Sequence, residues 1–139
     1  MHDPLELGLD NRPKFMPDSI SREHMPLIFR DVPESVKAHA RILLEKGWRI
    51  YAVNQTRGRC YGGYKKVITI PVWAIKDKRP NYKTWYISHE LAHAFDNCQH
   101  NHGPEFMEWL KAICPTDCIH YELGYKPRNA SAAGIMLEL

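Results

Sequence analysis

The sequence predicts an α+β domain in which helices pack on a short antiparallel sheet of three strands. Apolar residues recur at helical spacing in three stretches, and three short runs rich in β-branched and aromatic residues lie between the first two. The chain has 139 residues, of which 44% are apolar and 25% charged, so it can form one domain with its own core. Short loops between the strand candidates favour an antiparallel meander.

The first half of the chain supplies one helix and the three strands. The helix begins at Pro33-Glu34-Ser35 and stops near Gly47, and its apolar face holds Val36, Ala40, Ile42, Leu43 and Leu44. The strand candidates are residues 48–53, 59–61 and 66–72. A charged connection over residues 76–81 then leads to the second helix.

The second half supplies two helices. Asn81 can cap a helix that runs to about Cys98. The next helix begins at Gly103-Pro104, with proline in the first turn, and ends at Pro115. Its predicted buried stripe is Phe106, Trp109, Leu110 and Ile113.

We divide the chain into an N-terminal arm (1–29), a central domain (30–125) and a C-terminal tail (126–139). The arm holds four prolines and no clear period, which is typical of an extended segment that packs on a domain. The longest mostly apolar run covers residues 67–75, whereas a membrane span needs about 20 residues. No signal peptide is recognisable at the N-terminus, so we expect no membrane association and a cytoplasmic location.

Charge and cysteine content indicate two further features. Residues 30–83 carry 13 basic and 4 acidic side chains, which could form a surface for a polyanion such as DNA or could simply be a solvated face. In a cytoplasmic chain, the four cysteines are expected to be thiols or metal ligands rather than disulfides. They form no C-x-x-C pair, which argues against a zinc ribbon.

The strongest motif is His89-Glu90-Leu91-Ala92-His93, an H-E-x-x-H pattern within the second predicted helix. Residues four apart lie on one helix face, so both imidazoles can bind one Zn²⁺. Glu90 can then act as the general base for a metal-bound water. The alternative is a pair of ordinary surface histidines.

A catalytic zinc needs a third protein ligand. His102 is the preferred candidate because the helix must end and the chain must turn back just before Gly103-Pro104. His100 is the competing candidate, and Cys98 is a weaker one because it lies near the end of the same helix.

Taken with His102-Gly103-Pro104-Glu105-Phe106, the H-E-x-x-H motif resembles the SprT-like (SprT/Spartan) zinc metallopeptidases over roughly residues 34–123. The segments Arg59-Cys60-Tyr61 and Ile68-Thr69-Ile70 resemble the strand pair before that family's metal helix. The resemblance implies a small zincin-like domain with one Zn²⁺ per chain. It also implies ligands at His89, His93 and His102, with Glu90 as general base.

The chain departs from the family at its C-terminal end. Many members carry a zinc ribbon or DNA-binding segments. Neither is recognisable in this sequence, so the chain resembles a minimal single-domain member of the family. Members also have a Tyr-His pair after the last helix, whereas here the order is His120-Tyr121. Either residue could donate to the oxyanion or contact the substrate, and the alternative is a strand histidine beside a packed tyrosine.

The expected function is therefore that of a zinc-dependent metalloendopeptidase acting on protein or peptide substrates. By the resemblance, the expected substrates are DNA-associated proteins, including proteins crosslinked to DNA, with residues 30–83 contacting the phosphates. The rival hypothesis is a non-catalytic binding module with a closed structural zinc site. Its ligands would come from Cys98, His100, Cys114, Cys118 and His120.

Overall fold

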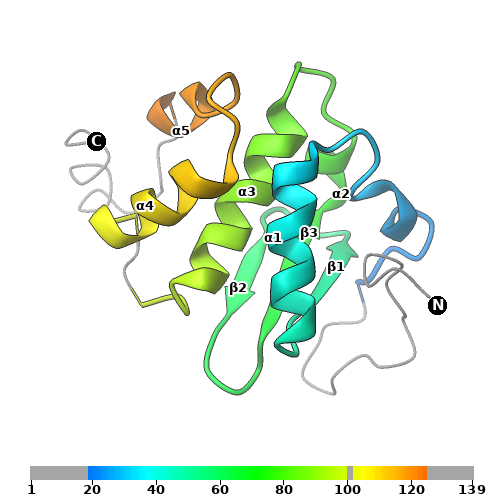
Figure 1. The fold of residues 1–139 in the computed structure, drawn as a ribbon. Helices are drawn as coiled ribbons and strands as arrows, with labels where there is room; N and C mark the ends of the chain where they lie inside the picture. The colour runs from blue at the N-terminus through cyan, green and yellow to red at the C-terminus, as the bar shows by residue number, and fades with distance from the viewer. Residues whose placement is uncertain (1–18, 100–101, 125–139) are drawn as a thin grey trace.

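The computed structural model describes residues 19–99 and 102–124, and within this part it has the predicted α+β class (Figure 1). Helices pack against a small three-stranded sheet, and α3 is the helix that carries the H-E-x-x-H sequence. The elements in chain order are η1 (Met25–Leu27), α1 (Glu34–Glu45), β1 (Arg49–Val53), β2 (Arg59–Tyr61), β3 (Val67–Pro71), α2 (Val72–Ile75), α3 (Tyr82–Phe95), α4 (Pro104–Ile113) and α5 (His120–Gly124).

The sheet is mixed, so the prediction of an antiparallel meander is wrong for one of its two pairings. The strand order is β1-β3-β2, with β1 parallel to β3 and β2 antiparallel to β3. Every residue of β3 is buried, whereas the short β2 has a partly exposed pattern that suits an edge strand. The wholly buried strand therefore takes the centre, and residues 54–66, which contain β2, become the connection between two parallel strands.

The outer edge of β1 is covered by the described part of the predicted N-terminal arm. Ile20 forms an antiparallel bridge with Val53, and Ser21 N–H donates to the Ala52 carbonyl at 2.9 Å. Met25, Ile28 and Phe29 follow and are buried in the same core as the sheet. Residues 19–29 are thus packed on the domain, while residues 1–18 and the predicted tail at 126–139 lie outside the described residues.

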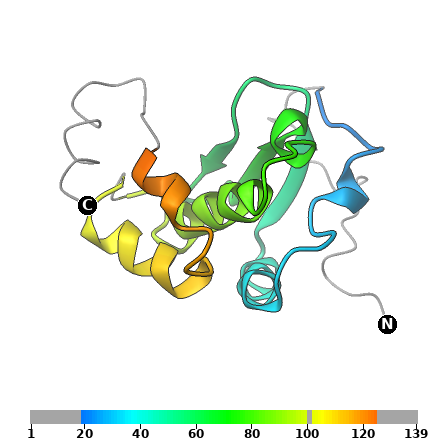
Figure 2. The same ribbon diagram turned by 90° about the horizontal axis from the view of Figure 1, so that it is seen from above.

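Helix α3 is the central element of the fold. It contacts β2, β3 and the helices α1, α2, α4 and α5, and it runs through the middle of the molecule in Figure 2. A helix with neighbours on several sides must be buried around most of its circumference. Its buried residues are Thr84, Trp85, Ile87, Ser88, His89, Glu90, Leu91, Ala92 and Ala94.

The predicted helix ends are close to the observed ones. Helix α4 begins at Pro104 as expected, and α1 ends before Gly47, whose φ of 95° is a left-handed conformation that favours glycine. Asn81 precedes α3, but its side chain makes no capping hydrogen bond; its carbonyl instead accepts from Trp85 N–H at 3.0 Å. None of the helices in residues 19–99 and 102–124 combines the length and apolar character that a membrane crossing requires.

Two residues predicted to lie in the core are partly exposed. Ile42 is 41% exposed because it lies about 100° around α1 from the buried stripe that ends at Leu43. Trp109 is 38% exposed, and its ring stacks on Phe95 with 4.6 Å between centroids. The large indole thus covers the end of α3 instead of entering the core.

Lys83 joins the N-terminal segment to α3 and provides a test of this packing. Its Nζ donates to the carbonyls of Leu27, at 3.0 Å, and Arg30, at 2.6 Å, and burial lowers its pKa. Lys83→Met keeps the aliphatic stem but removes both hydrogen bonds, so we expect a loss of about 1–3 kcal/mol in the free energy of unfolding. Urea denaturation measures this loss. Lys78→Met at an exposed site is the control, expected to change stability by less than about 0.5 kcal/mol, and equal effects of the two variants would contradict the assignment.

Candidate metal centre

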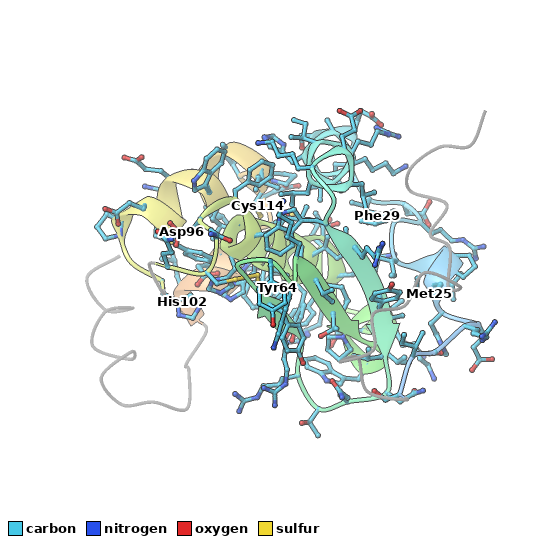
Figure 3. The ribbon with its side chains drawn as sticks, turned by 90° about the horizontal axis from the view of Figure 1, so that it is seen from below. Met25, Phe29, Tyr64, Asp96, His102 and Cys114 are labelled. Atoms are coloured by element: carbon cyan, nitrogen blue, oxygen red, sulfur yellow. A yellow bond between two sulfur atoms is a disulfide. The ribbon has the colours of Figure 1, made fainter. Side chains whose placement is uncertain are left out.

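Three histidine side chains that the sequence analysis selected as ligands converge on one point. His89 and His93 lie one turn apart on α3, and His102 lies just before α4. His89 Nε2 is 3.2 Å from His93 Nε2 and 3.1 Å from His102 Nε2. In Figure 3, His102 lies at the end of the molecule opposite Met25.

The spacing of these nitrogens fits a single metal ion. Two nitrogen ligands at 2.0–2.1 Å from a tetrahedral ion are about 3.3 Å apart, close to the observed separations. The possible ligand atoms of the three residues all lie within 4.8 Å of one another. Among the described residues, this is the one group of three or more histidine, cysteine or acidic side chains that could hold a metal ion.

Phe106 supports all three imidazoles from one side. Its ring is fully buried on α4, and its centroid lies 5.1 Å from that of His89, 4.5 Å from that of His93 and 5.0 Å from that of His102. Contacts of this kind restrict the imidazole rotamers and exclude water from that side of the site. The Phe106 position in the His-Gly-Pro-Glu-Phe segment therefore has a structural role beside the ligands.

Glu122 is the site residue that the sequence analysis missed. Its buried carboxylate Oε1 lies 2.7 Å from His89 Nδ1 and accepts a hydrogen bond from Trp85 Nε1 at 3.0 Å. When His89 Nδ1 donates its proton to this oxygen, the Nε2 lone pair is directed at the metal position. Ligand histidines commonly donate to a carboxylate, but the sequence offers many acidic residues and no local spacing that selects Glu122.

The electrostatics of the site follow from burial and from the Glu122 carboxylate. Burial, helped by the neighbouring imidazoles, lowers the pKa of His93 to about 2. Burial also lowers the pKa of His102 to about 4. For His89, burial alone would lower the pKa, but the Glu122 carboxylate outweighs it and the pKa is raised. His93 and His102 are therefore neutral near pH 7, as metal ligands must be, and a cation at the site would compete with a proton on His89.

Glu90 follows the first ligand and is buried with 6% of its surface exposed. Burial raises its pKa to about 7, and the attraction of His89 offsets this only in part. A carboxyl group with a pKa near the working pH can both accept and return a proton. A bound cation would favour its ionised form.

His120 and Tyr121 lie on α5 rather than on the expected strand. His120 is exposed, and its Nδ1 lies 3.1 Å from the Asp117 carbonyl. The Tyr121 hydroxyl donates to the Pro80 carbonyl at 2.8 Å, and its ring packs edge-on against Tyr82. These contacts anchor α5 to the start of α3, and an oxyanion or substrate contact for either residue stays a prediction.

The cysteines differ from the expectation of four thiols or metal ligands. Cys60 on β2 and Cys98 after α3 form a disulfide across 38 positions of sequence. Cys114 and Cys118 are buried thiols, and burial raises their pKa values to about 11 and 12. The closed site of the rival hypothesis is not assembled in the described residues, because the Cys98 sulfur is bonded to Cys60 and His120 is exposed. His100, which is also the competing third ligand, lies outside those residues.

Many of the basic side chains of residues 30–83 are exposed. They lie on β2, on the loops beside it and around α2, and include Arg57, Arg59, Lys65, Lys76, Lys78 and Arg79. Arg79 pairs with Asp77 at 2.9 Å and lies over the Tyr82 ring at 3.7 Å from its centroid. Contact between this segment and DNA remains a prediction.

No protein-family model, curated protein or solved structure matches the chain.

The role assigned to Glu122 can be tested by Glu122→Gln, which keeps the shape of the side chain but removes its charge. We expect zinc affinity to fall by about 10–100-fold, because the neutral amide is a weaker hydrogen-bond acceptor than the carboxylate that orients His89. Competition with a chelator of known affinity measures the change. Glu105→Gln, an exposed glutamate at the start of α4, is the matched control. An unchanged affinity for Glu122→Gln would show that His89 needs no carboxylate partner.

Proposed function

We propose that the protein is a zinc-dependent metalloendopeptidase of the SprT-like type, with a zincin-like arrangement around α3. The observation that carries this proposal is the convergence of three buried or half-buried imidazole Nε2 atoms beside the buried carboxyl group of Glu90. A ligand set of three histidines leaves one tetrahedral position open, which is the pattern of catalytic rather than structural zinc sites.

Each residue has a distinct task in this proposal. His89, His93 and His102 hold the ion, and Glu122 and Phe106 hold the imidazoles in place. When bound, zinc supplies a Lewis acid that polarises the peptide carbonyl and makes a water molecule more acidic. Glu90 takes the proton from the attacking water and transfers it to the amine that leaves. A pKa near 7 suits a group that performs both transfers.

The edge of the sheet suggests how a substrate is held. Strand β2 pairs with β3 on one side, contacts α3, and is the outer strand in the order β1-β3-β2. An extended peptide could add to its outer edge as a further strand, which would fix the peptide backbone beside the metal helix. This mode of binding favours unfolded or extended substrate segments over compact domains.

The catalytic proposal is tested by comparing Glu90→Gln with His102→Ala. We expect Glu90→Gln to retain about one zinc per chain and to lose cleavage of an unfolded labelled protein such as casein, by about 100-fold or more. We expect His102→Ala to lose most of the zinc as well as the activity. Metal analysis and a fluorescence cleavage assay provide the two readouts.

The possible outcomes separate the proposal from its rival. Undiminished cleavage by Glu90→Gln would overturn the assigned mechanism. Zinc bound by the wild type without any cleavage would favour the non-catalytic binding module. Zinc retained in full by His102→Ala would move the third ligand to His100.

Residues 30–83 and the family resemblance support DNA-associated proteins as substrates. Exposed cations that contact phosphates release counterions, so affinity for DNA should fall steeply with salt. We expect single-stranded DNA to bind at low salt, with an affinity that decreases at least tenfold between about 50 and 200 mM salt. Fluorescence anisotropy with a labelled oligonucleotide measures this. No binding at low salt, or binding that is independent of salt, would remove DNA from the proposal and leave the peptidase.

A further inference from the structure

The turn that follows α3 is held by the hairpin of β2 and β3. The disulfide joins Cys60 on β2 to Cys98 in this turn. One residue earlier, the Asn97 side-chain oxygen accepts a hydrogen bond from Gly63 N–H at 3.2 Å. Gly62 lies so close that a Cβ on it would be 2.9 Å from the Asn97 carbonyl oxygen. A covalent bond, a hydrogen bond and a close backbone approach therefore fix the same two residues.

The backbone of this turn has a conformation that needs such support. Asn97 and Cys98 have φ values of 52° and 57°, in the left-handed region that residues other than glycine rarely occupy. Two successive residues in this region cost free energy unless the surroundings hold them in place. Within the turn itself, Cys98 N–H donates to the His93 carbonyl at 2.8 Å. The β2–β3 hairpin adds contacts to Asn97 and Cys98 from a distant part of the chain.

The supported turn lies between the second and third metal ligands. Cys98 comes five residues after His93 and four residues before His102. His93 lies within α3, whereas His102 lies after this turn and just before α4. The hairpin therefore holds the described residues that come shortly before His102, the one candidate ligand that α3 does not carry.

We propose that the Cys60–Cys98 disulfide positions His102 for metal binding, so that opening it weakens the hold of the protein on its metal. The inference rests on the metal centre of the proposed function but not on peptidase activity. In this inference, β2 is more than an edge strand, because its Cys60 helps to place the third candidate ligand, His102. In the cytoplasm, where we expect this chain, a disulfide is more often redox-active than permanent.

The opening reaction is thiol–disulfide exchange with a dithiol reductant. One thiolate of the reductant attacks a sulfur of the Cys60–Cys98 bond and expels the other cysteine as a thiolate. The second thiolate of the reductant attacks the mixed disulfide and releases the remaining cysteine. Two electrons pass from the dithiol to the protein, the reductant leaves as its disulfide, and the protein thiolates take protons from water. Cys60 and Cys98 are both partly exposed, so a reductant can reach this bond.

The test compares zinc affinity in the two redox states of the wild-type chain. The reduced form is prepared with a phosphine that is then removed under argon, and affinity is measured by competition with a chelator. We expect zinc to bind at least about tenfold more weakly after reduction, the lower end of the loss seen when support for a ligand is removed. Thiol counting in denaturant should give two thiols per chain before reduction and four after it.

Substitutions separate the tether from other effects of reduction. Cys60→Ser with Cys98→Ser should reproduce the weaker binding without reductant, with folding checked by circular dichroism. Gly62→Ala keeps both cysteines but presses a methyl group against Asn97, and should also weaken binding. Tyr64→Ser is the control, because Tyr64 lies on the same hairpin and is 90% exposed.

Several results would overturn the inference. Four thiols in the unreduced chain would mean that the disulfide does not form. Equal zinc affinity in both redox states would overturn the positioning role alone and leave the metal centre intact. The single variant Cys60→Ser leaves Cys98 as a free thiol. If it bound zinc more tightly than the double variant, Cys98 would be a zinc ligand and not part of a positioning tether. No zinc in any form would overturn the metal centre and this inference together.

Discussion

The contact between His89 Nδ1 and the buried Glu122 carboxylate is the interaction on which the site depends. A carboxylate without a cationic or hydrogen-bonding partner would not remain ionised at this depth, and His89 and Trp85 both contact its Oε1. The pKa of Glu122 is accordingly lowered, because the attraction of His89 outweighs the effect of burial. With His89 held in this way, its Nε2 faces those of His93 and His102. The ligand geometry is thus built into the core.

Helix α3 has to serve both as the centre of the core and as the carrier of the site. The helix buries apolar side chains in the core, among them Ile87, Leu91 and Ala94. It also buries two polar side chains, His89 and Glu90. A helix packed on several sides cannot rotate or shift without disturbing the core, so the ligands that it carries keep their places. The polar burial is tolerated because it is concentrated on a few groups that interact with one another.

Sequence reasoning succeeded where the determining contacts are local. The spacing of His89 and His93, and the position of Pro104 at the start of α4, are set within one or two helical turns. It failed where the contacts join distant segments. The parallel pairing of β1 with β3 and the bond between Cys60 and Cys98 depend on the arrangement of the whole fold. Glu122 was missed for the same reason, since its partner His89 lies 33 residues earlier.

The three candidate ligands owe their positions to three different parts of the chain. His93 is fixed by α3 itself, His89 is oriented by Glu122 on α5, and His102 follows a turn that the β2–β3 hairpin holds. A metal bound by all three would therefore join α5, the hairpin and the central helix through one centre. Because metal binding contributes its free energy only when all three parts are in place, it would stabilise the hairpin, the central helix and α5 as a unit. By the same linkage, a change in any one of these supports, even one far from the three histidines in sequence, would alter the metal affinity of the site.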